Sequence, residues 1–192
     1  EYNFRNNIEI NKLGKFELNK FIFNNGKHII KKNLIFPKNI DVEINENTEI
    51  ILNPNVSVII YSSLYMNGTP QNQIYIRSIN NEKSFGSFAA IGGSDHEVQI
   101  NNLKINKPSE TRINGKYLSG GLSLYNFNNI NIQNLEIKNS QGEDALNIKY
   151  AKNCNFKNIY IKNSKFDAID IDNCKTTGEN LNIQNSNSSD KN

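Results

Sequence analysis

The sequence predicts an all-β domain whose short parallel strands stack into a β-helix. A heptapeptide occurs three times in the last third of the chain, a second motif repeats in phase with it, and both alternate apolar with polar residues. The 192 residues also include 38 asparagines and 28 isoleucines, well above average usage. A solenoid with coils of 22–24 residues accounts for all of these features.

Two repeated motifs define the strands of each coil. The heptapeptide copies start 24 and 22 residues apart, at residues 134–140, 158–164 and 180–186. The second motif recurs at offsets of 24 and 23, at residues 121–124, 145–148 and 168–171. Period-two alternation is typical of half-buried strands, which bury their apolar faces when successive coils stack. Leucine-rich repeats have a similar length, but this alternation leaves no room for their helical or irregular segment.

The first half of the chain carries looser strand signals of the same kind. Asn, Gly and Pro separate the strand-like residues 42–44, 49–52, 56–60 and 74–76. The segment from Lys107 to Tyr117 is an insertion, because it lengthens the gap between the heptapeptide-like residues 102–105 and the next copy to 32 residues. An insertion in a solenoid projects from one face, which is often the binding face.

Asparagines recur at equivalent corners of the predicted coils, at Asn139, Asn163 and Asn185. Asn tolerates the left-handed backbone of a tight bend, and its amide can bond to the Asn stacked above it. We therefore expect a corner ladder. An AT-rich genome is an alternative source of part of the Asn and Ile excess, but it does not explain the phase.

Composition argues against several classes of protein. The net charge of +3 comes from 22 basic and 19 acidic residues spread through the chain, which gives little support to nucleic-acid binding. No apolar run is long enough to span a membrane. Cys154 and Cys174 form no metal or CxxC motif, and the sequence leaves open whether they are bridged. Because Cys154 aligns with Ile130, a buried thiol is favoured over a reactive one.

We expect one domain over residues 1–192. The chain begins with Glu1 rather than Met, which suggests a processed or excised piece. Its polar end, residues 187–192, leaves open a continuation into a longer polypeptide.

The sequence resembles the secreted bacterial right-handed parallel β-helix proteins of the pectate-lyase-like superfold. The resemblance covers about residues 30–192, and its motifs are GTPQNQIYI (68–76), GGLSLY (120–125), EDALNI (143–148) and DAIDID (167–172). It implies a right-handed helix, a secreted or cell-surface location, and further modules of the same polypeptide as partners. The superfold hosts lyases, hydrolases, epimerases and adhesins, so it does not fix the activity. The Gly-His-Gly and Arg-Ile-Lys elements of polygalacturonases are absent from this sequence.

Polar residues of the second motif form the candidate site. Alternation turns Asn147, Lys149, Asp170 and Asp172 outward, and stacking adds Ser123 and Tyr125 to their columns. We expect Glu143, Asp144 and Asp167 in the turns just before these strands. The candidate catalytic residues are Asp170, Asp172 and Lys149, and the candidate ligand-binding residues are Glu143, Asp144, Asp167, Asn147 and Tyr125.

Two interpretations of this patch remain open. Asp144, Asp167, Asp170 and Asp172 can form a Ca²⁺ site, or two carboxyl groups can act as acid and base on a sugar. The resemblance also implies a third role, because some lyases of this superfold use a lysine base beside a Ca²⁺ site. Lys149 is the candidate for that base. The structural alternative is that the acids cap backbone groups or are solvated, and that Lys149 and Asp172 form a cross-strand ion pair.

The leading functional hypothesis is an extracellular module that binds or processes a polysaccharide, with an acidic polysaccharide as partner and Ca²⁺ as the candidate cofactor. The alternative is a non-catalytic structural or adhesin-type module of a larger protein. The sequence does not decide whether the protein is an enzyme.

Overall fold

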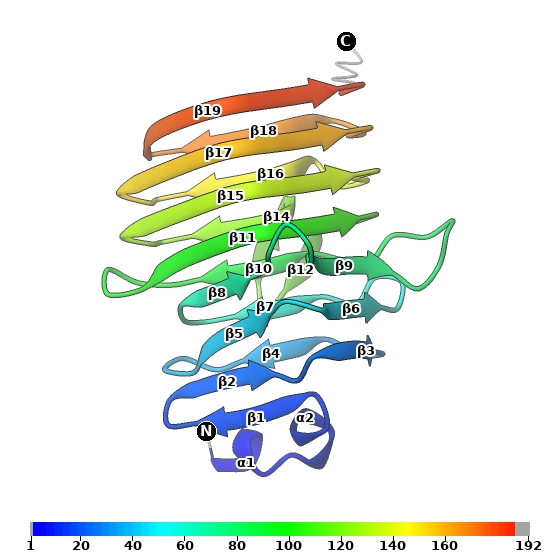
Figure 1. Ribbon diagram of the computed structural model, residues 1–192, viewed down its shortest axis with the longest axis vertical. Helices are drawn as coiled ribbons and strands as arrows, with labels where there is room; N and C mark the ends of the chain where they lie inside the picture. Colours follow the sequence, from blue (N-terminus) through cyan, green and yellow to red (C-terminus); the bar gives the residue numbers. More distant parts are fainter. Residues whose placement is uncertain (1, 187–192) are drawn as a thin grey trace.

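The computed structural model describes residues 2–186, and nearly all of its regular secondary structure is β-strand (Figure 1). Within these residues the strands form a large sheet, a smaller sheet and a hairpin. The large sheet contains β1 (Gly14–Glu17), β2 (Lys20–Phe23), β3 (Gly26–Ile30), β5 (Asp41–Asn45), β6 (Thr48–Leu52), β8 (Leu64–Asn67), β9 (Ile74–Ser78), β11 (Glu97–Asn106), β15 (Asn129–Lys138), β17 (Asn153–Lys162) and β19 (Lys175–Gln184). The small sheet contains β4 (Leu34–Phe36), β7 (Val58–Ile60), β10 (Phe88–Ile91), β14 (Gly120–Tyr125), β16 (Asp144–Lys149) and β18 (Asp167–Asp172).

The chain crosses from one sheet to the other in regular alternation from β14 to β19. Each strand pairs in parallel with the equivalent strand of the preceding pass. In the first half, two short strands such as β5 and β6 occupy the place of one long strand such as β15. The sheets of this all-β chain are therefore parallel apart from the terminal β1–β2 pair and the separate hairpin.

The predicted inward columns are confirmed by the strand register. Leu135, Ile159 and Leu181 pair along the large sheet. On the small sheet, Leu122 pairs with Leu146, which pairs with Ile169. Side chains of paired residues project from the same face, so these columns supply the core between the sheets. Leu181 is half exposed because β19 is the last described strand.

The predicted corner ladder is also confirmed. The side-chain amide of Asn163 donates to Asn139 at 2.9 Å, and that of Asn185 donates to Asn163 at 3.2 Å. All three asparagines have the left-handed backbone expected at a corner, with φ between 53° and 57°.

A second asparagine ladder, which the sequence analysis did not predict, runs through the middle of the long strands. Asn134 donates to Asn102, Asn158 to Asn134 and Asn180 to Asn158, at distances of 2.7–2.9 Å. These residues also have positive φ, and they bend each ten-residue strand at its sixth position. The bend lets one strand follow two sides of the core.

A compact cap covers the first pass. The cap comprises the short helices α1 (Tyr2–Arg5) and α2 (Ile8–Asn11) and the antiparallel pair of β1 with β2. Asn7 caps α2 by accepting bonds from the amides of Glu9 and Ile10. The ring of Phe4 contacts Phe16 and Phe36, so the cap is joined to the core through aromatic packing. Neither helix is long enough to cross a membrane, and the described residues contain no candidate span.

The insertion from Lys107 to Tyr117 projects from the small sheet, as predicted. It forms the hairpin of β12 (Thr111–Ile113) and β13 (Lys116–Leu118), in which the Arg112 guanidinium lies 4.2 Å from the ring centroid of Tyr117. Pro108 lies so close to Gly121 that a Cβ there would come within 2.5 Å of the proline ring. Glycine is therefore required where the insertion contacts the sheet.

Cys154 is buried, as its match to Ile130 predicts, but it is not the free thiol that this position favoured. It forms a disulfide with Cys174, which follows β18, and the two Cα atoms are 6.2 Å apart. The bridge joins the last described pass to β17.

We expect Asn163→Leu to lower the free energy of unfolding by about 2 kcal/mol, because leucine is strained at positive φ and breaks two ladder bonds. Asn163→Gly is the matched control, since glycine accepts this backbone and loses only the ladder. Chemical denaturation should place the glycine variant between the parent and the leucine variant. Equal stability of all three proteins would contradict a role for this corner.

Reduction of the Cys154–Cys174 disulfide should lower the stability of the protein by about 3 kcal/mol, because the bridge closes a segment with a sequence separation of 20 residues. Thermal melts with and without reductant measure the loss. The double variant Cys154→Ala/Cys174→Ala should have a melting temperature close to that of the reduced parent, and reductant should not change it. A parent that melts identically in both conditions would show that the bridge is not formed in solution.

Candidate functional site

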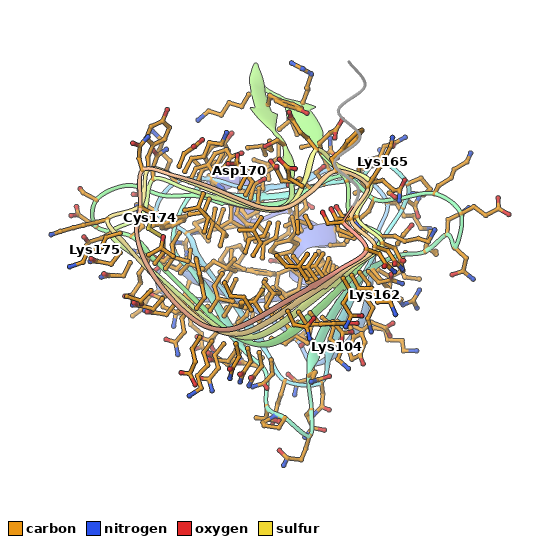
Figure 2. The ribbon with its side chains drawn as sticks, turned by 90° about the horizontal axis from the view of Figure 1, so that it is seen from above. Lys104, Lys162, Lys165, Asp170, Cys174 and Lys175 are labelled. Atoms are coloured by element: carbon orange, nitrogen blue, oxygen red, sulfur yellow. A yellow bond between two sulfur atoms is a disulfide. The ribbon has the colours of Figure 1, made fainter. Side chains whose placement is uncertain are left out.

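The candidate site lies on the outer face of β14, β16 and β18, beside the β12–β13 hairpin. Figure 2, which looks along the stack, shows Asp170 on the side of the molecule from which the hairpin projects. Tyr125, Lys149 and Asp172 are register partners, as are Ser123, Asn147 and Asp170. The two predicted outward columns are therefore confirmed.

Hydrogen bonds join the columns into a continuous row. The Tyr125 hydroxyl donates to the Asn147 carbonyl oxygen, and the Asn147 amide donates to Asp170 at 2.6 Å. Asn147 is fully buried although it points away from the core, because its neighbours cover it. Its orientation is therefore fixed from both sides, and it holds the Asp170 carboxylate in place.

Lys149 pairs with two carboxylates rather than one. Its Nζ lies 3.5 Å from Asp170 and 3.3 Å from Asp172. Burial lowers the pKa of Lys149, but the hydrogen bond to Asp172 and the charge of Asp170 outweigh burial and raise it. The side chain therefore stays an ammonium at neutral pH, which argues against the lysine-base role and confirms the cross-strand ion pair with Asp172.

Asp144 is the most unusual residue of the patch. We expected it in the turn before the strand, but it is the first residue of β16, pairs with Gly120 and Asp167, and is only 3% exposed. Burial raises its pKa to about 6, against a hydrogen bond to Ser119 that lowers it, and the charges of Asp170, Glu143 and Asp167 add to the rise. Asp144 can therefore hold or release a proton near neutral pH.

The hairpin forms a wall beside these carboxylates. The Tyr117 hydroxyl donates to Glu143 at 2.9 Å, and Glu110 accepts a bond from the Glu143 backbone amide at 2.8 Å. Burial and the bond to Glu143 raise the pKa of Tyr117 to about 12, so its hydroxyl remains a donor. Asp167, also expected in a turn, is the exposed first residue of β18.

The predicted Ca²⁺ site is not preformed in the described residues. Among residues 2–186, no group of three or more His, Cys, Asp or Glu side chains is placed to hold a metal ion. Asp170 and Asp172 share the ammonium of Lys149, which a cation would have to displace. Ca²⁺ binding by Asp144, Asp167, Asp170 and Asp172 stays a prediction.

Tyr150 is a further candidate residue beside the patch. It follows β16 with φ of 58°, and its side chain is 62% exposed. The equivalent corners after β14 and β18 are Asn126 and Asn173, which also have positive φ. Alignment of the repeats could have identified Tyr150 from the sequence, because it places a tyrosine at a corner where the other repeats have asparagine.

Comparison of the chain with protein-family models, curated proteins and solved structures finds no match.

Replacement of Asp144 by Asn should stabilise the protein above about pH 4, and the full effect should be reached above pH 6. The folded state binds the Asp144 proton with a pKa of about 6, whereas the unfolded chain releases it near 3.8, so this group reduces stability as the pH rises between these values. Asp144→Asn should be more stable than the parent by about 3 kcal/mol at pH 7.5, with the difference vanishing near pH 4.

Denaturant unfolding at the two pH values measures this difference. Asp172→Asn is the control, because it neutralises a half-exposed carboxylate that is paired with Lys149 and should give no such gain. A parent–Asp144→Asn difference that is the same at both pH values would contradict the raised pKa.

Proposed function

We propose that the protein is an extracellular right-handed parallel β-helix module that binds a polysaccharide on the outer face of β14, β16 and β18. The observation that carries this proposal is the exposed Tyr150, held in a left-handed conformation at the end of a row of polar side chains that are already oriented.

The proposed β-helix is supported by parallel pairing at a near-constant offset. Equivalent residues such as Leu135, Ile159 and Leu181 are 24 and 22 positions apart and pair directly. Connections between parallel strands of one sheet are right-handed in about 98% of cases. The same handedness is expected from the resemblance to pectate-lyase-like proteins.

An extracellular location is supported by the Cys154–Cys174 disulfide, which uses both cysteines of the chain. Disulfides persist in oxidising compartments and are rare in the cytosol. A polysaccharide of the cell surface or its surroundings is then within reach of the module.

Sugar binding is supported by the chemistry of the patch. A polysaccharide offers hydroxyl groups that donate and accept hydrogen bonds and C–H faces that pack on aromatic rings. The row supplies carboxylates, an amide and an ammonium, while Tyr150 supplies an exposed ring at the corner after Lys149. Strained backbone is typical of functional positions, so a tyrosine at a corner suited to asparagine favours a role in binding.

The patch also contains the two kinds of carboxyl group that hydrolysis of a glycoside requires. Glycoside hydrolysis uses one protonated and one ionised carboxyl group. Burial favours the protonated form of Asp144, whereas Asp170 faces the ammonium of Lys149 and the amide of Asn147. In this scheme Asp144 donates a proton to the leaving oxygen as the glycosidic C–O bond breaks, and Asp170 accepts a proton from the water that adds to the anomeric carbon.

A non-catalytic structural or adhesin-type module is the second candidate. It is favoured by the internal pairing of the patch, since Lys149 pairs with Asp170 and Asp172, and Glu143 is bonded to the hairpin. Such pairing satisfies these charges without a ligand.

Tyr150→Asn separates the two candidates. Asparagine relieves the left-handed backbone, so the variant should be about 1 kcal/mol more stable than the parent. If Tyr150 contacts the sugar, the variant should also bind polysaccharide about tenfold more weakly on a glycan array. The array is run with and without Ca²⁺ on the parent and on Asp170→Ala/Asp172→Ala. The comparison tests whether polysaccharide binding depends on Ca²⁺ and on these two carboxylates.

Leu18→Asn is the matched control. Leu18 has a φ of 51° and is 91% exposed in the β1–β2 turn, so its replacement should stabilise the protein to a similar extent without changing sugar binding. A parent that binds no polysaccharide, or a Tyr150→Asn variant that binds as tightly as the parent, would favour the structural module.

A further inference from the structure

The first pass of the chain has an unpaired strand edge. In the large sheet β3 pairs in parallel with β6 and with no other described strand. The neighbouring strand β2 is covered on this side by the antiparallel strand β1, which belongs to the cap. In Figure 1, β3 is the lowest strand on the right of the stack. The cap therefore covers one half of the first pass with a strand and leaves the other half without one.

Hydrogen bonds show which backbone groups of β3 point toward this edge. The Gly26 amide donates to the Asn47 carbonyl at 2.9 Å. The Ile30 carbonyl accepts from the Asn53 amide at 3.0 Å. Backbone groups alternate in direction along a strand, so the N–H and C=O of Ile29 face away from β6, toward the free edge. Within residues 2–186 these two groups have no hydrogen-bond partner, and such an edge is a template for pairing with another chain.

A groove of about 750 Å³ lies beside this edge. It is lined by α2 and the residues beside it, and by the end of β3 and its connection to β4. The apolar residues of the lining are Ile10, Leu13, Ile29, Ile30 and Leu34. Ile29 is 52% exposed, although the solvent face of a strand is usually polar. The groove thus offers an apolar surface next to unpaired backbone groups, within the size range of ligand sites.

Two lysines of the groove are not neutralised. Lys31 and Lys32 line it, are exposed, and form no ion pair with a carboxylate of residues 2–186. Glu9 also lines the groove, but it is engaged by Lys12 at 2.6 Å. The first 40 residues contain eight basic and three acidic side chains, a net charge of +5, whereas the whole chain has +3. The groove therefore favours an acidic partner through complementary charge.

We propose that the free edge of β3 binds an extended acidic peptide segment of a partner protein. The peptide adds a strand to β3 and pairs with the backbone of Ile29. Side chains alternate along a strand, so one apolar residue packs beside the Ile29 side chain while its two neighbours point into the groove. An acidic residue two positions farther along meets Lys31. The recognised motif is three apolar residues flanked by carboxylates, and its site is separate from the sugar patch.

An extended peptide accounts for more of these observations than other occupants do. A fatty acid or an anionic lipid would fill the groove and meet the lysines, but it has no row of donors and acceptors for the strand edge. A second copy of the chain has such a row in its own β3. However, it would bring a second pair of Lys31 and Lys32 close to the first, and like charges on paired strands are unfavourable.

Calorimetric titration of the full chain with the acetylated, amidated peptide Asp-Val-Ile-Val-Asp tests the proposal. Two copies of the peptide, N-methylated at the odd or at the even amides, keep its charge and side chains. Only the copy whose methyl groups face β3 should bind about tenfold more weakly, because it loses the donors that pair with the edge. The peptide Lys-Val-Ile-Val-Lys should also bind more weakly, and salt should reduce the affinity for the acidic peptide.

Variants of the protein test the same contacts from the other side. Ile29→Pro removes the amide that faces the edge and leaves the pairing with β6, since proline is tolerated on edge strands. It should weaken peptide binding about tenfold, whereas Ile29→Thr keeps the amide and should have a smaller effect. Lys31→Gln/Lys32→Gln should weaken binding about fivefold. Lys104→Gln/Lys162→Gln, which removes the same charge from β11 and β17, should bind like the parent.

Several outcomes would overturn the proposal. One is a parent that does not bind the acidic peptide, and another is equal binding of the unmodified and both methylated peptides, which would exclude pairing with a strand edge. Equal weakening by the two lysine pairs would indicate a net-charge effect. A parent dimer in analytical ultracentrifugation that Ile29→Pro dissociates would assign the edge to a second copy. If Ile29→Pro does not fold, the methylated peptides decide the question on the parent.

Discussion

Each pass of the chain can stack on the preceding one only if its corners fall at equivalent places, and asparagine in the left-handed conformation provides those corners. The ladder through Asn139, Asn163 and Asn185 ends one strand of each pass, and the ladder through Asn134 and Asn158 bends it. Between fixed corners the register is fixed as well, and a slip of one residue would turn the apolar columns toward solvent. The core and the outer columns both depend on this constraint.

The sequence predicted most of the regular architecture because each copy of a repeat has the same environment. Alignment alone gave the inward columns, the outward columns and one Asn ladder. The residues of the second ladder also align, since Asn134, Asn158 and Asn180 occupy equivalent positions of the repeat. The ladder was not predicted because the alternation of apolar and polar residues does not reveal a bend in the middle of a strand. The cap formed by α1, α2 and β1 has no repeat to reveal it. The pairing of Cys154 with Cys174 depends on their separation in space, which spacing along the chain does not determine.

The sequence predicted which residues lie in the patch, but it did not predict which of them hold a proton. Alternation placed Asn147, Lys149 and Asp170 on one face, and the structure agrees. Burial differs strongly along that face, because the hairpin and neighbouring side chains cover one part and leave another open. Asp144 is thereby buried while Asp167 is exposed, although the two are register partners. Period-two patterns describe direction only, so neither the raised pKa of Asp144 nor the significance of Tyr150 followed from them.

The outer face of the small sheet gathers Asp167, Asp170 and Asp172 around a single lysine, Lys149. Asp170 and its neighbours lie on the small sheet, whereas Lys104 and Lys162 lie on the large one (Figure 2). A charge distribution of this kind exerts a torque on the molecule as it approaches a charged layer, before any contact is made. Near a negatively charged matrix the module would turn its large sheet inward and leave the small sheet and the hairpin pointing away. The stacked strands would thus set the orientation in which the module arrives.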